Sequence, residues 1–169
     1  CTMRGLSLTA PWPHLIAVAE LAPELGKHHE TRSWPTSYRG WVAIHAAKNL
    51  RHVGGIFGLS DLCARPPFRQ ALDTYLELLS APANADPATV LTFGAIVAVA
   101  WLQECYEIRP SGLWEHSTTR PLPRGNDRAF GDYAPGRYAW HLTRIRALPA
   151  PVACTGAQGL WMVPATAEA

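Results

Sequence analysis

A nearly unbroken apolar run at residues 94–104 sets the strongest limit on how this chain folds. Ile96, Val97, Val99 and Leu102 leave the run almost without a polar face, which is typical of a β-strand covered on both sides. No apolar stretch is long enough to cross a bilayer as a helix. With 48% hydrophobic and 17% charged residues, the composition excludes a disordered chain, and we predict a packed domain around this strand.

Weaker patterns predict the other elements. We expect helices at residues 11–23 and 66–79 and strands at residues 4–9, 29–34, 41–46, 137–148 and 158–163. In the strand at 137–148 the alternation slips between Leu142 and Ile145, which indicates a bulge near Thr143, and the prolines at 149 and 151 should end it. Residues 49–65 are ambiguous, and the composition of 81–92 and 107–136 is that of loops.

These elements predict an α+β fold that is mainly β, with a small twisted barrel and one or two helices packed on it. The helices do not alternate regularly with the strands, so we do not expect parallel βαβ units. A length of 169 residues fits a single domain, which we place at residues 3–169.

The cysteines and histidines indicate no metal site. Cys63, Cys105 and Cys154 lie far apart without a CxxC pair, and the adjacent His28 and His29 would point to opposite faces of a strand. We therefore expect reduced thiols, no metal and no cofactor, in a cytoplasmic protein without a membrane segment.

The net charge of +2 hides an uneven distribution. Residues 26–52 and 120–146 each carry a local charge of +4, and the remainder of the chain carries −6. The two basic segments could form one face for phosphate or carboxylate ligands. They could equally be two unrelated solvated stretches, and charge alone does not decide between these alternatives.

The most specific group of polar side chains lies at residues 26–34. On a strand, Glu30, Arg32 and Trp34 share one face, and Lys27 stands just before it. A guanidinium and an ammonium suit phosphate or a polar base edge, and an indole ring offers a stacking surface. The alternative is a Glu30–Arg32 ion pair that only orients the strand.

Four further residues are candidates. The strand at 41–46 contains His45, and Lys48 follows its end; a histidine in an apolar strand is more often a hydrogen-bonded core residue than a catalyst. Near the end of the long loop, Tyr133 could stack on a base and Arg137 could contact phosphate. Alternatively, Tyr133 belongs to the core, where we also expect Trp12 and Trp161.

A set of short motifs resembles the ASCH (activating signal cointegrator-1 homology) domain family, in the order in which that family has them. The motifs are Leu6-Ser-Leu-Thr-Ala-Pro-Trp12, Gly26-Lys27-x-x-Glu30-x-Arg32-Ser-Trp34, Tyr38-Arg-Gly40, Ile44-His-Ala-Ala-Lys48, Gly94-Ala-Ile-Val, Phe130-Gly-Asp-Tyr133, Pro135-Gly-Arg-Tyr-Ala-Trp140 and Gly159-Leu-Trp161. Residues from about 51 to 92 show no distinctive match, so we expect a helical insertion there.

The resemblance implies a PUA-like fold, a small mixed β-barrel with flanking helices and a cleft on one side. It also implies binding of nucleic acid, usually RNA. Lys27, Glu30 and Arg32 match the family signature Gly-x-Lys-x-x-Glu-x-Arg, which is thought to line the cleft. The glycine differs, because Leu25 occupies its usual position and Gly26 directly precedes the lysine.

Three functions follow as hypotheses. The first is a module for RNA, single-stranded nucleic acid or a nucleotide, bound in a basic cleft by Lys27, Glu30, Arg32, Trp34, Lys48, Tyr133 and Arg137. The second, implied by enzymes that resemble this family, is a hydrolase of acetylated cytidine or of RNA. Glu30 stands where the amidohydrolases have a threonine, so such an enzyme would work by a different mechanism, with Glu30 as a general base on water and Lys27 or His45 as the acid. The third is a protein-interaction module that presents Trp114 and Pro121-Leu-Pro123.

Overall fold

The computed structural model describes residues 3–82, 84–111, 115–116 and 122–164. The strands are β1 (Arg4–Leu8), β2 (His29–Arg32), β3 (Gly40–Ala46), β4 (Ala95–Glu107), β5 (Pro110–Ser111), β6 (Glu115–His116), β7 (Tyr138–Ala153) and β8 (Leu160–Met162). The helices are α1 (Trp12–Leu21), the 3₁₀ turn η1 (Arg51–Val53), α2 (Gly55–Cys63), α3 (Phe68–Leu78), α4 (Pro87–Val90) and α5 (Gly125–Ala129).

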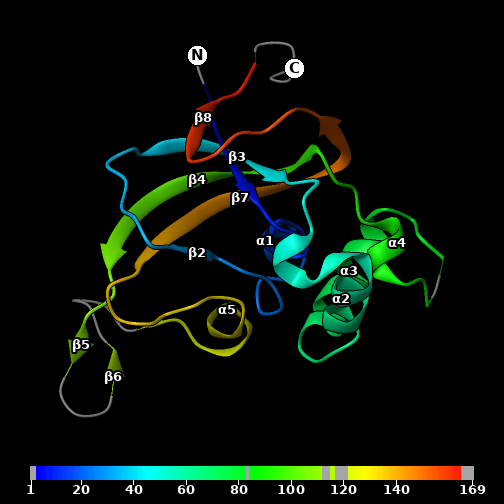
Figure 1. The fold of residues 1–169 in the computed structure, drawn as a ribbon, viewed down its shortest axis with the longest axis horizontal. Helices are drawn as coiled ribbons and strands as arrows, with labels where there is room; N and C mark the ends of the chain where they lie inside the picture. Colours follow the sequence, from blue (N-terminus) through cyan, green and yellow to red (C-terminus); the bar gives the residue numbers. More distant parts are fainter. Residues whose placement is uncertain (1–2, 83, 112–114, 117–121, 165–169) are drawn as a thin grey trace.

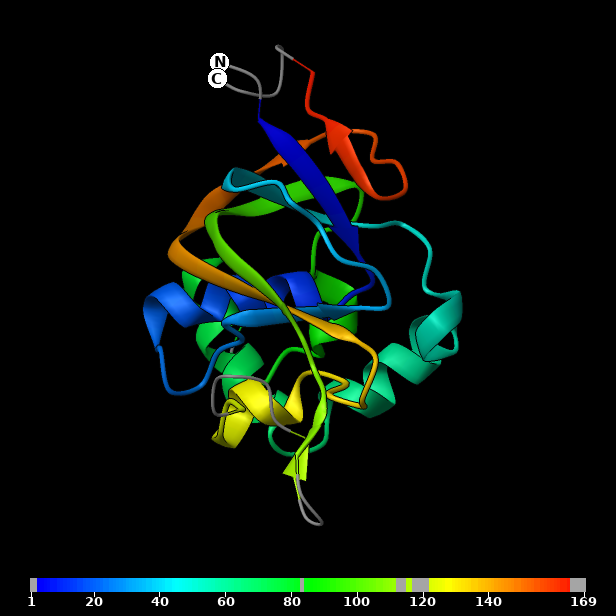
Figure 2. The same ribbon diagram turned by 90° about the vertical axis from the view of Figure 1, so that its left-hand side faces the viewer.

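A six-stranded, strongly curled sheet forms the body of the molecule (Figures 1 and 2). The strand order is β2-β7-β4-β3-β1-β8, so that β4, the apolar run, lies inside the sheet between the long β7 and β3. The curl gives the sheet the shape of a half-barrel, and a separate ribbon pairs β5 with β6. The prediction of a mixed α+β fold that is mainly β is confirmed at this level.

One pair of strands corrects the predicted topology. β1 and β3 are parallel neighbours, with Leu6 opposite Ile44 and Ser7 opposite His45. Parallel strands need a long connection, and here that connection contains α1 and also β2, which pairs with β7 at the far edge of the sheet. The expectation that no parallel pair joined by a helix occurs was therefore wrong.

β7 confirms one prediction and corrects another. Trp101 pairs with Thr143 and Val99 with Arg146, so β7 has one extra residue between Thr143 and Arg146, and this bulge lies where it was predicted. The strand does not end before Pro149, because it continues to Ala153. A second irregularity accommodates the prolines, since pairing jumps from Ala98–Ala147 to Ile96–Val152.

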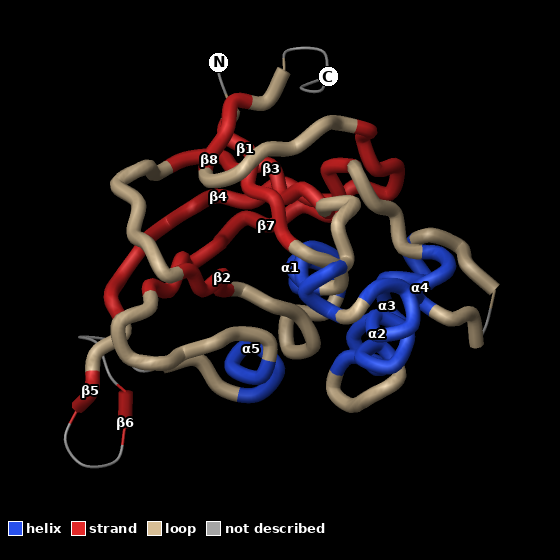
Figure 3. Tube along the Cα trace, in the orientation of Figure 1, coloured by secondary structure: helices blue, strands red, loops and turns tan. Residues whose placement is uncertain are grey.

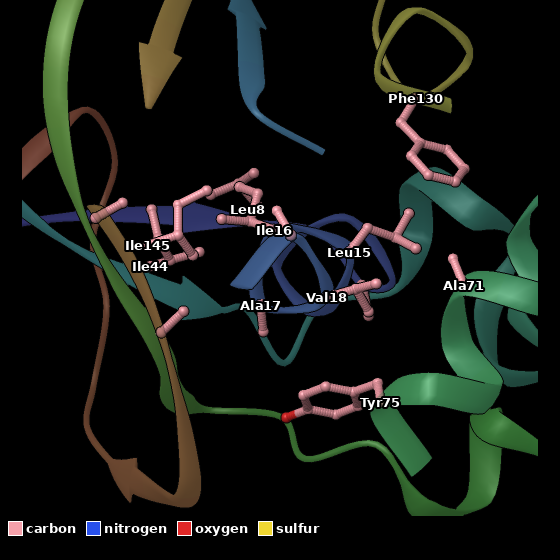
Figure 4. Close-up of a cluster of buried hydrophobic side chains, with 14 of the residues drawn as sticks. Leu8, Leu15, Ile16, Ala17, Val18, Ile44, Ala71, Tyr75, Phe130 and Ile145 are labelled. Atoms are coloured by element: carbon pink, nitrogen blue, oxygen red, sulfur yellow. The ribbon is translucent and has the colours of Figure 1, made fainter. Parts of the chain in front are cut away.

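α1 lies at the centre of the core. Its residues Leu15, Ile16, Ala17 and Val18 are fully buried between the sheet and α3, as Figure 4 shows. Both sides of this short helix are covered, which accounts for a sequence that is apolar except for His14 and Glu20.

The other helices gather mainly beside α1. α2, α3 and α4 lie on one side of the sheet, whereas α5 stands apart below β2 (Figure 3). The residues at 81–92 were expected to be a loop, but Pro87–Val90 forms α4 because Asp86 caps its first turn by accepting a hydrogen bond from Ala88 N. None of the helices in the described part of the chain is long and apolar enough to cross a membrane.

Candidate functional site

A cleft lies where the curled sheet does not close. β8 pairs with β1 only at Arg4, Gly5 and Leu6, and the cleft of about 870 Å³ is lined by the residues that follow on β1 and by β2. This volume is typical of small-molecule sites. The lining residues are Ser7, Leu8, Thr9, Trp12, Glu30, Thr31, Arg32, Ser33, Trp34, Ala47, Asn49, His52, Ala129, Phe130, Gly131, Asp132, Arg137, Ala157, Gln158 and Gly159.

Glu30 and Arg32 form the centre of the cleft wall. Arg32 Nη2 lies 3.3 Å from Glu30 Oε2 and donates a 2.9 Å hydrogen bond to the carbonyl of Ser7. It thereby joins β2 to β1 across the open side of the sheet. The Nε atom of Arg32 is buried and has no partner in the described part of the chain, while about a quarter of the side chain stays exposed. The exposed part of the guanidinium can donate to a ligand in the cleft.

Lys27 lies behind this wall rather than in the cleft. Its side chain is only 1% exposed, and Nζ donates a 2.6 Å hydrogen bond to the carbonyl of Phe130 and lies 3.5 Å from Glu30 Oε1. Burial lowers the pKa of Lys27, an effect that the charge of Glu30 opposes. We had expected Lys27 to contact the ligand, but the structure buries it behind the wall. There Lys27 positions Glu30 and the carbonyl of Phe130.

Gly26 explains why Lys27 sits so deep. A Cβ atom at residue 26 would collide with the backbone of Ala19 in α1. The chain therefore passes directly against α1, where Lys27 N donates a 3.0 Å hydrogen bond to the carbonyl of Leu15. Gly26 therefore has a packing role.

Arg137 reaches the same cleft from a distant part of the sequence. Its Nη2 donates a 3.1 Å hydrogen bond to the carbonyl of Thr31 on β2, and its Nε lies 3.5 Å from Asp132 Oδ2. The cleft is thus lined by two arginines and two carboxylates, of Glu30 and Asp132. Its charged lining residues are mixed in sign, and the cleft is less basic than the sequence led us to expect.

Two tryptophans line the cleft. Trp34 follows β2, which ends at Arg32 rather than at the predicted residue 34, and its ring packs edge-on against Trp140 with centroids 4.8 Å apart. Trp12, which we expected only in the core, packs edge-on against Phe68 and also borders the cleft. Both rings are partly buried, so each combines a packing role with accessible surface.

Tyr133 does not reach the cleft, although it was a candidate for stacking. It is 4% exposed and packs with Ile108 and Ala139 in a small core of its own. Arg128 lies over its ring, and burial raises the pKa of the Tyr133 hydroxyl. Of the two alternatives for Tyr133, the structure supports the core residue.

His45 and Lys48 line a second, adjacent cavity of about 820 Å³. His45 Nδ1 lies 2.9 Å from Ser7 Oγ, and its Nε2 lies 2.7 Å from the carbonyl of Cys154. His45 is therefore separated from Lys27 and Glu30, with which we had grouped it. Ser7, Ala47, Asn49, Ala157 and Gln158 border both cavities.

Sequence reasoning missed Ser7, Asn49 and His52 among the residues that line these cavities. Ser7 was the only one with a signal, as the single hydroxyl between two buried leucines of β1. Trp114 and Pro121, candidates for protein contact, lie outside the described residues, and Leu122 packs against the core around Ile108.

Among the residues that the structure describes, no three histidine, cysteine, aspartate or glutamate side chains are grouped to hold a metal ion. Cys63, Cys105 and Cys154 are free thiols, and burial raises the pKa of Cys63 to about 12. A comparison of the chain with protein-family models finds no match, and a comparison with curated proteins finds none either.

Proposed function

We propose that the cleft binds a single unpaired nucleotide, and that the chain is an RNA- or single-stranded-DNA-binding module with the PUA-like, ASCH-type organisation that its sequence resembles. The observation that carries this proposal is the pairing of Glu30 with Arg32 on one wall of the cleft. A carboxylate accepts hydrogen bonds and a guanidinium donates them, so together they complement the polar edge of a base, where amino groups adjoin ring nitrogens or carbonyls.

The surroundings of this pair support a planar ligand with a phosphate. Trp34 and Trp12 border the same cleft and could stack on a base, which is how unpaired bases are commonly held. Arg137 brings a second guanidinium to the cleft, about a third of it exposed. Only Arg32 and Arg137 supply a fixed positive charge among the described lining residues, so few phosphates should be bound.

Fluorescence anisotropy with labelled ten-nucleotide single strands of RNA and DNA tests the proposal. We expect binding at 25 mM salt, weaker binding to a fully paired hairpin, and a slope of log K against log salt of about −0.7 to −1.4, as for one or two neutralised phosphates. Arg32→Lys keeps the charge but loses the planar fork, and should weaken binding about tenfold or more.

Arg65→Ala, on an exposed residue after α2, is the matched control and should bind as the unchanged protein does. Absence of binding to every oligonucleotide at low salt would overturn the proposal, and so would equal affinity in Arg32→Lys. Cleavage of the RNA, or deacetylation of acetylcytidine, that is lost in Glu30→Gln would replace binding by hydrolysis as the function of the cleft.

A further inference from the structure

The second cavity contains a hydrogen-bonded serine and histidine. Ser7 Oγ lies 2.9 Å from His45 Nδ1, and His45 Nε2 lies 2.7 Å from the carbonyl oxygen of Cys154. A carbonyl can only accept, so Nε2 carries a proton, and the Nδ1 of a neutral ring accepts from the Ser7 hydroxyl. Burial lowers the pKa of His45, which favours this neutral form near pH 7.

Two further groups fix the position of the serine oxygen. Trp161 Nε1 donates a 3.1 Å hydrogen bond to Ser7 Oγ and would stabilise negative charge on that oxygen. Gly156 packs against the pair, since a Cβ atom at this position would lie 2.6 Å from His45 Nδ1 and would also collide with Ser7 Oγ. A nucleophile, a base, a carbonyl that orients the base and a donor to the nucleophile are therefore assembled at one point.

The cavity above this point has the size and charge of a small-molecule site. Ser7 and His45 both line it, and Lys48 is the one lining residue with a fixed charge among those that the structure describes. Most of the other lining residues are small, including Ala153, Gly156 and Ala157. The stem of Lys48, an exposed residue, packs over Gly94 beside the cavity.

The geometry points to a hydrolytic site in which Ser7 is the nucleophile and His45 the general base, acting on a small ester that carries an anionic group. Such an activity differs from the proposed nucleotide binding, because the side chains of Glu30 and Arg32 take no part in the chemistry, although Ser7 borders both cavities. Lys48 would attract the anionic group of the substrate, and residues 155–158 line the same cavity.

The reaction balances without a cofactor. Ser7 Oγ attacks the ester carbonyl carbon while His45 Nδ1 takes the hydroxyl proton. The tetrahedral intermediate then breaks its bond to the alcohol oxygen, which receives that proton from His45, and an acyl group remains on Ser7. Water attacks the acyl carbon, gives a proton to His45 and releases the carboxylic acid, and His45 returns the proton to Ser7 Oγ.

The test uses two esters with the same leaving group, neutral 4-nitrophenyl acetate and anionic mono-4-nitrophenyl succinate. We expect the whole chain to release nitrophenol faster than buffer does, with a higher kcat/KM for the succinate. Ser7→Ala should lower kcat/KM about 100-fold or more, while Ser37→Ala, at an exposed serine far along the chain, should not. Lys48→Ala should reduce kcat/KM for the succinate more than for the acetate.

Covalent labelling separates a catalytic from a structural role. Phenylmethylsulfonyl fluoride should leave one sulfonyl adduct on the peptide that contains Ser7, as seen by mass spectrometry, and His45→Gln should prevent it although the hydroxyl remains. Gly156→Ala should also reduce labelling by disturbing the hydrogen bond. Equal rates in Ser7→Ala and the unchanged protein, or labelling that is absent from Ser7 or unaffected by His45→Gln, would overturn the inference.

Discussion

The two cavities share a wall yet are stabilised in opposite ways. Behind the first, Lys27, Glu30 and Arg32 form a chain of charges in which Lys27 and Glu30 are buried. Beside the second, Ser7 and His45 are joined by one hydrogen bond between neutral groups. Ser7 belongs to both, because its carbonyl accepts from Arg32 and its hydroxyl faces His45.

The difference determines what each cavity tolerates. A buried charge that loses its partner retains its full cost of desolvation. Removing any one member of the charged set should therefore destabilise the fold strongly. A neutral hydrogen-bonded pair can lose a member for a smaller cost, set mainly by the group that is left unsatisfied. We therefore expect substitutions in the charged set of Lys27, Glu30 and Arg32 to affect folding, and those at Ser7 and His45 to affect chemistry more than folding.

The largest expected effect is that of Lys27→Met. The substitution leaves Glu30 buried with Arg32 as its one charged partner and removes the hydrogen bond to Phe130, so we expect the free energy of unfolding to fall by about 3–5 kcal/mol. Urea unfolding measures this change. Adding Glu30→Gln should restore part of the loss, and a cost below about 1 kcal/mol for Lys27→Met alone would contradict a buried charged set.

We expect acid to destabilise the fold through histidines that are buried in their neutral form. His14 and His45 are two of these, and His14 is fully buried. Burial lowers the pKa of His14 to about 4, from an ordinary value of 6.5. Below pH 6.5, His14 binds a proton in the unfolded chain but stays neutral in the folded protein. The free energy of unfolding therefore falls between pH 6.5 and 4, and below pH 4 the contribution of His14 changes no further. The expected loss from His14 is about 3 kcal/mol.

Urea unfolding at pH 7 and at pH 4.5 measures this acid effect. His14→Gln should remove most of the pH dependence, and the remainder should include the share of His45, whose pKa is also lowered by burial. Contacts with His29 lower the pKa of Asp127, although burial opposes this effect. The stability that Asp127 contributes is therefore lost only below its ordinary pKa of 3.8, outside the range from pH 7 to 4.5. An unchanged pH dependence in His14→Gln would contradict the assignment.

Gly156→Ala should cost about 1–3 kcal/mol, because the added methyl group meets Ser7 and the ring of His45. The test is a double-mutant cycle with Ser7→Ala, measured by urea unfolding. Removing the serine oxygen should make room and reduce the cost of the alanine. If the two costs simply add, the close approach is not the reason for the glycine.

The smallest effect on stability is expected for Arg137→Ala. Arg137 is 30% exposed and its carboxylate partner Asp132 is 65% exposed, so their attraction is screened and the cost should stay below about 1 kcal/mol. Arg109→Ala, in the exposed pair with Glu107, is the matched control. A loss near that of Lys27→Met would mean that the two sides of the cleft are equally essential for folding.

Hydrophobic periodicity was sufficient to predict two kinds of element: those with a single apolar face, and those that are apolar on every side. The apolar run of β4, the stripe of α3 with Leu72, Tyr75 and Leu76, and the bulge near Thr143 were all visible in the sequence. The parallel pairing of β1 with β3 was not visible in the sequence. The strand that lies between them along the chain, β2, is at the opposite edge of the sheet. The alternation of apolar and polar residues within a strand does not show which distant strand it pairs with.

For the cleft, alternation on β2 was enough to place Glu30 and Arg32 on one wall. It could not show that Lys27 is buried, since this depends on the contact of Gly26 with Ala19 in another element. Tyr133 was equally undecided, because a tyrosine in a loop packs or stacks according to its tertiary neighbours. The link between Ser7 and His45 arises only from the parallel register of β1 and β3.

The bridge from Arg32 to the Ser7 carbonyl has a mechanical consequence. Elsewhere the strands of the half-barrel are joined by backbone ladders, whose spacing is fixed, but across the opening one long side chain spans from β2 to β1. Rotation about the side-chain torsions of Arg32 would release this link, while β2 keeps its backbone pairing with β7 and β1 keeps its pairing with β3.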